Sequence, residues 1–469
     1  MPLSVLTDDE IRILLEHLTL DELESFTNEL RFALHQYSTN TQSIDDNLIH
    51  QPHRTSVRSP TTGATTLFMP SCSTAGHGVK VITLSSAGGQ KSVDPQLPII
   101  RPTGAITLFA PDGRPTGILH ASTLTAFRTA LASACLLIRR NTVRTVTVFG
   151  CGEQAYWHVR LALLLRGSTI RQVNIINHRF GDSCRAILAR FYGAPRAAKR
   201  REGWEEAQFG ILTPGYGEYP RLLKEQLRAA DVVFCCTPST VPLFEAAILT
   251  SREGRRKGRL VVAIGSYTPQ MHELPIDLLR QATRTHEKGH HHYHKHAMEG
   301  GVIVVDTLDG ALKEAGEIIE ARLEPTQLVE LGELVMIHKS AVAEDEEAET
   351  GSVASFPSVP SAELEKFDLS PSGTASAMSS VFSSEGAPSS SRTPSPSRRE
   401  SGHFSLHRSN SSRSSTDRQK RKDNRFARWL QEGNVIYKSV GLGLMDLTVG
   451  LKVIELAKKK GVGSHIEGF

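Results

Sequence analysis

Val146-Thr-Val-Phe-Gly150-Cys-Gly152-Glu-Gln-Ala155 is the stretch of this 469-residue chain that decides its fold. An apolar strand is predicted before the turn and a helix after it, and the turn itself reads G-x-G-x-x-A. Gly150 permits a tight turn, and Gly152 lets the backbone approach a pyrophosphate, which the free N–H groups of the helix N-terminus would bind. The stretch therefore predicts a dinucleotide-binding site. The alternative is a glycine turn with a purely structural role.

The next predicted strand indicates which cofactor is bound. It ends at Asn177-His178-Arg179, where an acid would bind a ribose 2′-OH and repel a 2′-phosphate. Neither Asp nor Glu is present, and Arg179 can pair with a phosphate, so the sequence favours NADP(H) over NAD(H). A solvated loop cation at Arg179 is the alternative. The residues expected at the cofactor from this part of the chain are Gly150, Gly152, Glu153, Gln154, Asn177, Arg179 and Thr237.

A βαβ rhythm surrounds the glycine turn. Helix Glu153–Arg166 is followed by a strand at Val173–Ile176, and further apolar strands are predicted at Val232–Cys236, Leu260–Ile264 and Val302–Val305. Continuous apolar strands that alternate with helices are typical of a parallel sheet covered on both faces. The middle of the chain therefore predicts a Rossmann domain of the α/β class.

The residues before this sheet predict a different architecture. Two capping boxes and helical apolar spacing predict two helices within residues 1–40. Short extended runs punctuated by Gly, Pro and Asp follow between Arg54 and Leu119, which is typical of an antiparallel sheet. A long helix rich in Ala and Leu is then expected over Thr123–Arg139.

Residues 340–425 contain long Ser runs, several Pro and almost no aromatic residues. Such a segment cannot bury enough apolar surface to offset its chain entropy, so we expect it to be disordered. Beyond it, the sequence predicts a strand at Asn434–Val440 and an amphipathic helix at Asp446–Lys460. Order on both sides of the segment predicts an insertion inside a domain.

Composition limits the function classes. The net charge of +4 is small for this length and does not indicate a nucleic-acid partner. No stretch approaches the ~20 apolar residues that span a bilayer, and the first residues lack the basic start of a secretory signal. The six cysteines are scattered without zinc-site spacing and are interpreted as reduced thiols. We expect a cytoplasmic protein with no membrane partner and no metal.

Several further segments have no explanation in a bare Rossmann fold. Two of them are the motifs T-x-x-R-T-A at 125–130 and K-S-V-G at 438–441. In order and spacing the segments resemble the ornithine cyclodeaminase/μ-crystallin family, which includes ketimine reductases and some alanine dehydrogenases. The resemblance covers most of residues 1–330 and 432–469. The segments that carry it are 51–55, 68–70, 78–81, 124–130, 148–155, 263–269, 306–316 and 437–447.

The resemblance implies a role for each matching residue. Arg54, Lys80 and Arg128 match the family's cationic substrate pocket, which holds the carboxylate of an amino or imino acid against the nicotinamide. An Arg fork suits a carboxylate, and a desolvated Lys among cations can exchange protons, so Lys80 is the expected catalytic residue. A structural ion pair is the alternative for Arg128. Three hydroxyls are implied near the cofactor, against the alternative of turn or cap hydroxyls: Thr103, Thr129 and, closing over the nicotinamide, Ser439.

The resemblance also implies the domain organisation. A Rossmann NAD(P)-binding domain at 141–330 is inserted into a discontinuous α+β substrate-binding and dimerisation domain at 1–140 and 432–469. The disordered Ser-rich insertion takes residues 340–428. A homodimer formed through the substrate domain is expected from the family alone.

One departure bears on the reaction. Ornithine cyclodeaminases carry an Asp in the segment after the strand Leu260–Ile264, whereas this chain has Tyr267 in that place. A phenol of pKa ~10 is a poor base at neutral pH. We therefore predict hydride transfer from NADPH to the C=N carbon of a small cyclic ketimine or imino acid, or the reverse amino-acid oxidation. The alternatives are an NAD-dependent ornithine cyclodeaminase, which forms proline and ammonia, and a non-catalytic protein that binds NADPH and a small ligand.

Three polar segments are interpreted without a functional site. The histidines of 290–296 have no Cys or acid at helical spacing and are interpreted as a solvated loop, against metal uptake. Motifs for proline-directed and basic-directed kinases occur within 392–401, and both regulatory phosphorylation and chance occurrence stay open. The basic run at 418–425 is interpreted as solvated charge, against an address or an RNA-binding patch.

Overall fold

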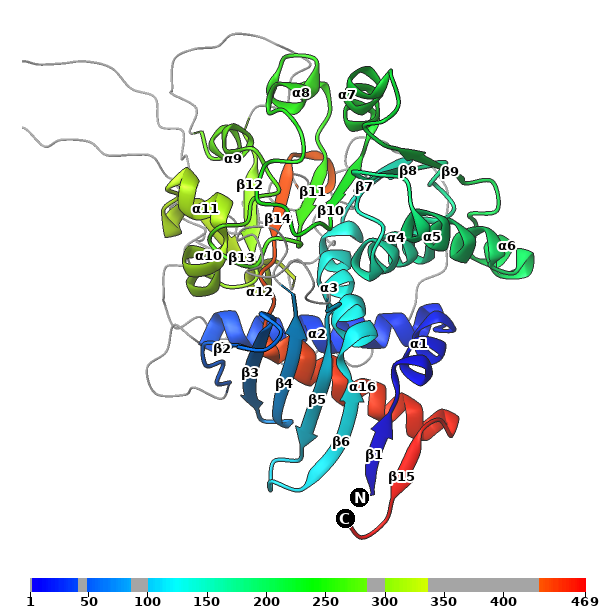
Figure 1. The fold of residues 1–469 in the computed structure, drawn as a ribbon, viewed down its shortest axis with the longest axis vertical. Helices are drawn as coiled ribbons and strands as arrows, with labels where there is room; N and C mark the ends of the chain where they lie inside the picture. Colours follow the sequence, from blue (N-terminus) through cyan, green and yellow to red (C-terminus); the bar gives the residue numbers. More distant parts are fainter. Residues whose placement is uncertain (1, 41–48, 86–99, 285–299, 336–429) are drawn as a thin grey trace, which may run out of the picture. The chain divides into compact units, whose positions relative to one another are not determined.

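The computed structural model describes residues 2–40, 49–85, 100–284, 300–335 and 430–469 (Figure 1). Within these residues two sheets carry the fold, one parallel and one largely antiparallel. The predicted Ser-rich insertion at 340–428, the histidine-rich segment, the kinase motifs and the basic run lie outside the described residues. Among the described helices, none is both long and apolar enough to cross a bilayer.

The parallel sheet contains eight strands of the described chain, and every neighbouring pair in it is parallel. From β7 the chain builds outward to β8 and β9, and it then returns to place β10 on the other side of β7. This reversal opens a crevice at the carboxyl ends of β7 and β10, where α/β sheets bind ligands. In spatial order the strands are β13 (Leu328–Glu330), β12 (Val302–Val305), β14 (Val435–Lys438), β11 (Leu260–Ala263), β10 (Val232–Cys235), β7 (Thr145–Phe149), β8 (Gln172–Ile176) and β9 (Gln208–Leu212).

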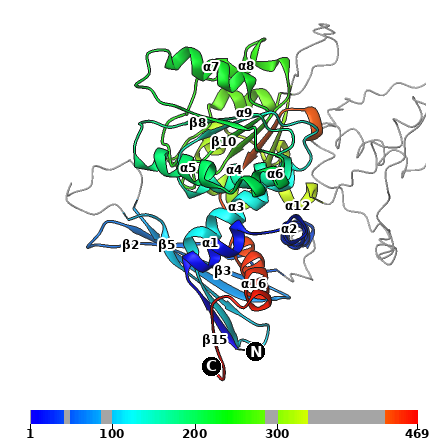
Figure 2. The ribbon, with the colours of Figure 1, turned by 90° about the vertical axis from the view of Figure 1, so that its right-hand side faces the viewer.

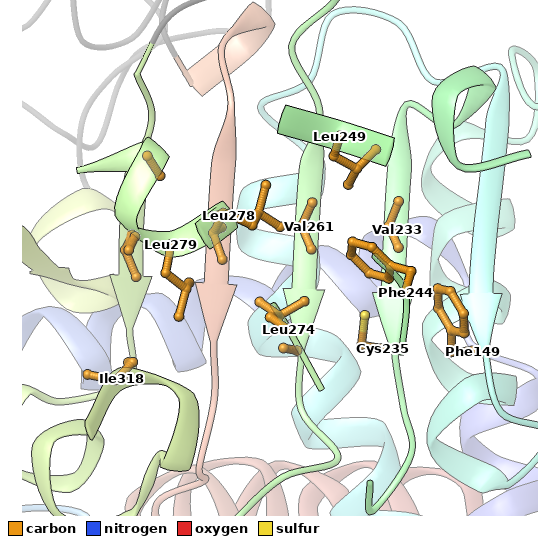
Figure 3. Close-up of a cluster of buried hydrophobic side chains, with 14 of the residues drawn as sticks. Phe149, Val233, Cys235, Phe244, Leu249, Val261, Leu274, Leu278, Leu279 and Ile318 are labelled. Atoms are coloured by element: carbon orange, nitrogen blue, oxygen red, sulfur yellow. The ribbon is translucent and has the colours of Figure 1, made fainter. Parts of the chain in front are cut away.

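Helices cover both faces of this sheet, so its central strands are almost entirely buried. Figure 3 shows one face, where Leu249 and Leu278 lie beside the strand residues Val233 and Val261. On the opposite face the His158 ring lies 5.0 Å from the Phe234 ring. The helices of this half are α4 (Glu153–Arg166), α5 (Asp182–Gly193), α6 (Arg196–Glu202), α7 (Tyr219–Ala229), α8 (Ala247–Thr250), α9 (Ile276–Ala282), α10 (Leu308–Glu314), α11 (Gly316–Ala321) and α12 (Leu331–Leu334), with 3-10 turns η1 (Gly254–Arg256) and η2 (Pro325–Gln327).

The second sheet has seven described strands and is antiparallel except where β1 runs parallel to β6. The C-terminal helix α16 (Gly443–Lys460) lies along one face of it (Figure 2). Glycines allow the close approach, since a Cβ on Gly450 would lie 2.9 Å from the Leu108 side chain. In spatial order the strands are β15 (Ser464–Ile466), β1 (Leu3–Leu6), β6 (Pro115–His120), β5 (Thr103–Phe109), β4 (Gly76–Leu84), β3 (Thr65–Ser73) and β2 (Thr55–Arg58); α1 (Asp8–Glu16), α2 (Leu20–Asn40) and α3 (Ala121–Leu137) complete this half.

The predicted α/β fold with a Rossmann sheet and a second α+β part is confirmed. One placement needs a correction. The sequence assigns all of 432–469 to the substrate domain, but β14 pairs with β11 and β12 inside the parallel sheet. All four residues of β14 are buried, so the strand needs cover on both faces, which the middle of a parallel sheet provides. Only α16 and β15, which follow it, lie with the antiparallel sheet.

Candidate active site

A cavity of about 1020 Å³ is lined by residues of both sheets, by α3 and by the start of α4. This volume is at the upper end of the range of ligand pockets, ~300–1,000 Å³. Eight of the residues predicted from the sequence line it together: Arg54, Lys80, Arg128, Thr129, Gly152, Glu153, Gln154 and Ser439. The cavity therefore joins the predicted substrate cations to the predicted cofactor turn.

Lys80 and Arg128 share one buried carboxylate. The Lys80 ammonium lies 2.6 Å from Asp446 Oδ2, and Arg128 Nε donates to Asp446 Oδ1 at 3.0 Å. All three side chains are at most 4% exposed. Burial lowers the pKa of Lys80 to about 8, and the charge of Arg128 acts in the same direction, whereas Asp446 opposes both. Lys80 can therefore gain or lose a proton near neutral pH.

The register of the antiparallel sheet explains the position of Lys80. On β4 the side chains of Lys80 and Ile82 share the buried face, because side chains alternate along a strand. Their direct cross-strand partners on β3 are Met69 and Leu67, which line the same cavity. The Lys80 ammonium is thus surrounded by an apolar sheet face, and Asp446 from α16 supplies the counter-charge that makes its burial tolerable.

Arg54 precedes β2 and reaches the same cavity from another direction. Its Nη2 donates to the backbone oxygen of Tyr267 at 2.7 Å and to the carboxylate of Glu314 at the end of α10. Its Nη1 lies 3.4 Å from the Val440 oxygen. Burial raises the pKa of Glu314, and Arg54 counteracts this shift. Arg54 is therefore held in place by an ion pair before any ligand contacts it.

The glycine turn fits a pyrophosphate. Gly150 has a φ of 103°, and a Cβ there would lie 2.9 Å from the backbone oxygen of Cys236, so only glycine suits the position. A Cβ on Gly152, the residue before α4, would meet no atom within 4 Å, which leaves the helix N-terminus open to an anion. Among the described side chains, Gln154 Oε1 and Thr125 Oγ1 are buried without a hydrogen-bond partner beside this opening. Backbone space and unused polar atoms therefore match a dinucleotide.

Five predicted cofactor residues do not line the cavity. Gly150 is packed closely against the backbone oxygen of Cys236, and Thr237 donates its N–H to Glu273 at 2.8 Å. Asn177 Nδ2 donates to the Arg179 oxygen at 2.8 Å, and the Arg179 side chain is exposed beyond the end of β8. Thr103 is exposed at the start of β5, opposite Thr83 of β4.

The predicted hydroxyls Ser439 and Thr129 line the cavity, but each already donates a hydrogen bond. Ser439 Oγ donates to Asp306 at 2.7 Å, and the N–H groups of Val440 and Gly441 donate to the same oxygen at 2.9 and 2.8 Å. Thr129 Oγ1 donates to the backbone oxygen of its own helix at Thr125, 2.8 Å away. Asp306 therefore fixes the K-S-V-G loop at the cavity.

Sequence reasoning missed three buried acids that position the site: Asp306, Asp446 and Glu273. Glu273 accepts hydrogen bonds from the N–H groups of Thr237, Gly265 and Ser266. Burial raises the pKa of Glu273 to about 7. Asp446 and Asp306 lie inside segments that carry the family resemblance, and an acid within an apolar helix start at Asp446 was the available signal. Glu273 gives no such signal, because only the folded chain brings three N–H groups to it.

Comparison with known proteins finds relatives of about one-quarter sequence identity. No protein-family model matches the chain. It is 26% identical to an uncharacterised protein of Saccharomyces cerevisiae over 71% of this chain and 86% of that one. It is 25% identical to a Δ1-pyrroline-2-carboxylate reductase of Bacillus cereus, covering 63% and 78%, and 24% identical to the mouse ketimine reductase μ-crystallin, covering 51% and 61%.

Solved structures show the same fold. The Δ1-pyrroline-2-carboxylate reductase of Thermococcus litoralis, in complex with NADH and L-proline, superposes with a TM-score of 0.58 at 15% identity, covering 99% of this chain and all of that one. The iminosuccinate reductase of Paracoccus denitrificans, in complex with NAD+, gives 0.57 at 17% identity, with full coverage of both chains. An archaeal alanine dehydrogenase dimer with bound NAD gives 0.57 at 18%, also with full coverage. By sequence relatives and fold together, the chain is similar to proteins of the ornithine cyclodeaminase/μ-crystallin type.

Proposed function

We propose that this chain catalyses the NAD(P)H-dependent reduction of a small cyclic ketimine or imino acid, or the reverse oxidation of the amino acid. The observation that carries the proposal is the meeting of Arg54, Lys80 and Arg128 at one cavity with the glycine turn. Relatives named as a pyrroline-carboxylate reductase and a ketimine reductase support the same reaction class.

In this proposal the arginines of the cavity bind the substrate carboxylate and the lysine transfers a proton. Arg128 lines the cavity while its Nε is held by Asp446, and with Arg54 it binds the substrate carboxylate. Lys80, whose pKa is lowered to about 8, gives a proton to the imine nitrogen in reduction and takes one in oxidation. When bound, the nicotinamide supplies or accepts the hydride at the carbon of the C=N bond. Orientation of an anionic substrate in a positive, water-poor site lowers the barrier.

The proposal extends to the cofactor and the assembly. Arg179 is exposed just beyond β8 with no acid in the Asn177–Arg179 segment, which supports NADP(H) over NAD(H). The domain organisation predicted from the sequence stays part of the proposal, with 141–330 as the cofactor domain and β14 added to its sheet. The proposal also includes a cytoplasmic homodimer, and the archaeal alanine dehydrogenase of similar fold, which is a dimer, supports this assembly.

Tyr267 weighs against ornithine cyclodeamination. It lines the cavity, and burial raises the pKa of its phenol above the ordinary value near 10. An uncharged phenol cannot replace the carboxylate that cyclodeaminases carry in this segment. We therefore expect imine reduction and not ammonia release.

The test follows reduced-nicotinamide absorbance with Δ1-pyrroline-2-carboxylate and Δ1-piperideine-2-carboxylate, using NADPH and NADH in parallel, beside an assay for proline formed from ornithine. We expect loss of absorbance with at least one imine, abolished in Lys80→Ala, and no proline from ornithine. Proline and ammonia formation without imine reduction would support the cyclodeaminase. Cofactor binding with neither reaction would support a binding protein.

A further inference from the structure

We propose that the cavity accepts a cyclic imino acid with one carboxylate and rejects one with two, and that Glu314 sets this selection by neutralising Arg54. The inference rests on the proposed function and names the substrate class of the same site. It follows from the charges that the described residues bring to the cavity and from the apolar surface between them.

The buried charged groups at Lys80 leave one positive charge unbalanced. Lys80 and Arg128 share the single carboxylate of Asp446, at 2.6 and 3.0 Å, so this group of three carries one net positive charge. All three side chains are nearly inaccessible to water, so solvent screens their charges weakly. One substrate carboxylate balances this excess.

Together with Glu314, Arg54 adds hydrogen-bond donors to the cavity but no net charge. It forms an ion pair with Glu314, and the two side chains are only 13% and 23% exposed. The pair is fixed further by the 2.7 Å hydrogen bond from Arg54 to the Tyr267 oxygen. A second ligand carboxylate placed at Arg54 would therefore also approach the carboxylate of Glu314, and like charges at short distance in a poorly solvated site are strongly unfavourable.

The described residues of the wall beside Lys80 are apolar and cannot pair with a second carboxylate. Leu67, Met69 and Ile82 line the cavity on the same face of the antiparallel sheet as Lys80. These side chains suit the methylenes of a small ring, whereas a charge buried against them would lose its hydration without compensation. The wall therefore favours a ring with no second charge.

Three further arginines of the described residues line the cavity, and two of them are paired with carboxylates. Arg190 is bound to Glu16 and Glu153 at 2.9 and 2.7 Å, and Arg12 pairs with Asp9. Arg101 lines the cavity with an exposed side chain. If a second carboxylate is accepted, Arg101 is the described residue that would receive it, so its variant belongs in the test.

The test measures binding without turnover, in the full-length protein saturated with NADPH, whose reduced nicotinamide ring is uncharged and cannot reduce the aromatic analogues used. Calorimetry compares the planar analogue pyrrole-2-carboxylate with pyrrole-2,5-dicarboxylate. We expect the monocarboxylate to bind at least about 100-fold more tightly, and Glu314→Gln to reduce that ratio about tenfold or more by releasing the charge of Arg54. Glu320→Gln is the matched control, because it removes a carboxylate that is 56% exposed and paired with His272, and its ratio should equal that of the wild type.

Equal affinity of the wild type for both analogues would overturn the inference. Dicarboxylate binding that is lost in Arg101→Gln would also overturn it, because the second carboxylate would then be bound by Arg101. A ratio that Glu314→Gln leaves unchanged would remove Glu314 from the explanation and contradict the inference in that form. Turnover distinguishes the two proposals. If neither cyclic imine is reduced, the proposed function is contradicted. If iminosuccinate is reduced with a kcat/KM similar to that of the cyclic monocarboxylates, only the selection against a second carboxylate is contradicted.

Discussion

Asp446 makes two buried cations compatible with a folded protein. Asp446→Asn removes the only counter-charge described for Lys80 and for Arg128 while keeping the side-chain volume. We expect the free energy of unfolding to fall by about 3–5 kcal/mol, as for other broken buried ion pairs. Urea unfolding of the variant measures this loss. Asp182→Asn, whose carboxylate is 99% exposed beside Arg185, is the control and should change stability by less than about 1 kcal/mol.

We expect Lys80 to set the pH dependence of the two proposed reaction directions. Its pKa of about 8 means that the ammonium is the proton donor below that pH and the free amine the acceptor above it. We expect kcat/KM for imine reduction to fall as pH rises through about 8, and kcat/KM for amino-acid oxidation to rise over the same interval. Asp446→Asn should move both limbs to lower pH, since Asp446 favours the charged form. Profiles without a limb in this range would argue against Lys80 as the proton carrier.

Arg179 is the residue on which the proposed NADP(H) preference depends. Its side chain is exposed beyond β8, where a 2′-phosphate would lie in this fold. We expect Arg179→Ala to raise the KM for NADPH about tenfold while the KM for NADH changes little, since a charge-assisted contact is lost for one cofactor only. Arg185→Ala removes a nearby surface cation and controls for general charge. An unchanged KM for NADPH would refute the assignment.

At the scale of elements, the loop between β14 and α16 connects the two halves of the site. Gly441 in this loop has a φ of 83°, and a Cβ there would lie 2.9 Å from Arg128 Nη2. We expect Gly441→Ala to lower stability by at least about 1–2 kcal/mol through the left-handed backbone. It should also lower kcat/KM about 100-fold, because Arg128 must move.

Gly461, which ends α16, is the matched position for this comparison. It has a φ of 65°, but a Cβ there would meet no atom within 4 Å. Gly461→Ala should therefore lose a similar amount of stability, about 1–2 kcal/mol, and keep its kcat/KM. Steady-state kinetics with thermal unfolding of both variants separates backbone strain from displacement of Arg128. Equal kinetics in the two variants would show that the loop does not position Arg128.

The elements also show what a sequence can and cannot reveal. The core strands β7, β8, β10, β11 and β12 are predictable because each is a short apolar run next to a turn. β1 and β15 are four and three residues long and are defined by pairing with distant strands, which no local pattern records.

The candidate site divides in the same way. Arg54, Lys80 and Arg128 were predicted through the family resemblance, and the structure brings them to one cavity. Their counter-ions Asp446 and Glu314 were not predicted, since ion pairs between residues hundreds of positions apart depend on the packing of α16 and α10 against the sheets. The cations expected to bind substrate can be predicted from sequence motifs, whereas the carboxylates that balance their charge can be identified only in the folded chain.

At the scale of the whole molecule, consecutive arginines hold both ends of the long interruption between 335 and 430. Arg139 donates to the Val335 oxygen at 3.0 Å, and Arg140 donates to the Leu430 oxygen at 3.0 Å. The two ends are thus fixed near each other by the residues that follow α3. We expect replacement of 340–428 by a Gly/Ser linker of about ten residues to change the free energy of unfolding by less than about 1–2 kcal/mol, because loop-closure entropy varies slowly with length.

Thermal unfolding and the imine-reduction assay check this expectation on the shortened chain. Retained stability together with retained kcat/KM would confirm that the described residues are sufficient for folding and for the proposed reaction. A chain that folds but loses more than about tenfold in kcat/KM would instead assign the replaced segment a part in the site, contrary to the charge arrangement proposed above.

The position of β14 between β11 and β12 has a consequence for biosynthesis. β14 follows β12 by roughly 130 residues and β11 by roughly 170, yet it completes the centre of the parallel sheet between them, so both neighbours leave the ribosome before their partner strand is made. At translation rates of ~5–20 residues per second their edges stay unpaired for roughly 7–35 seconds, a state that allows association with other nascent chains. Products of premature termination lack the central strand altogether, so cellular quality control would meet them as aggregation-prone fragments and not as partly active enzymes.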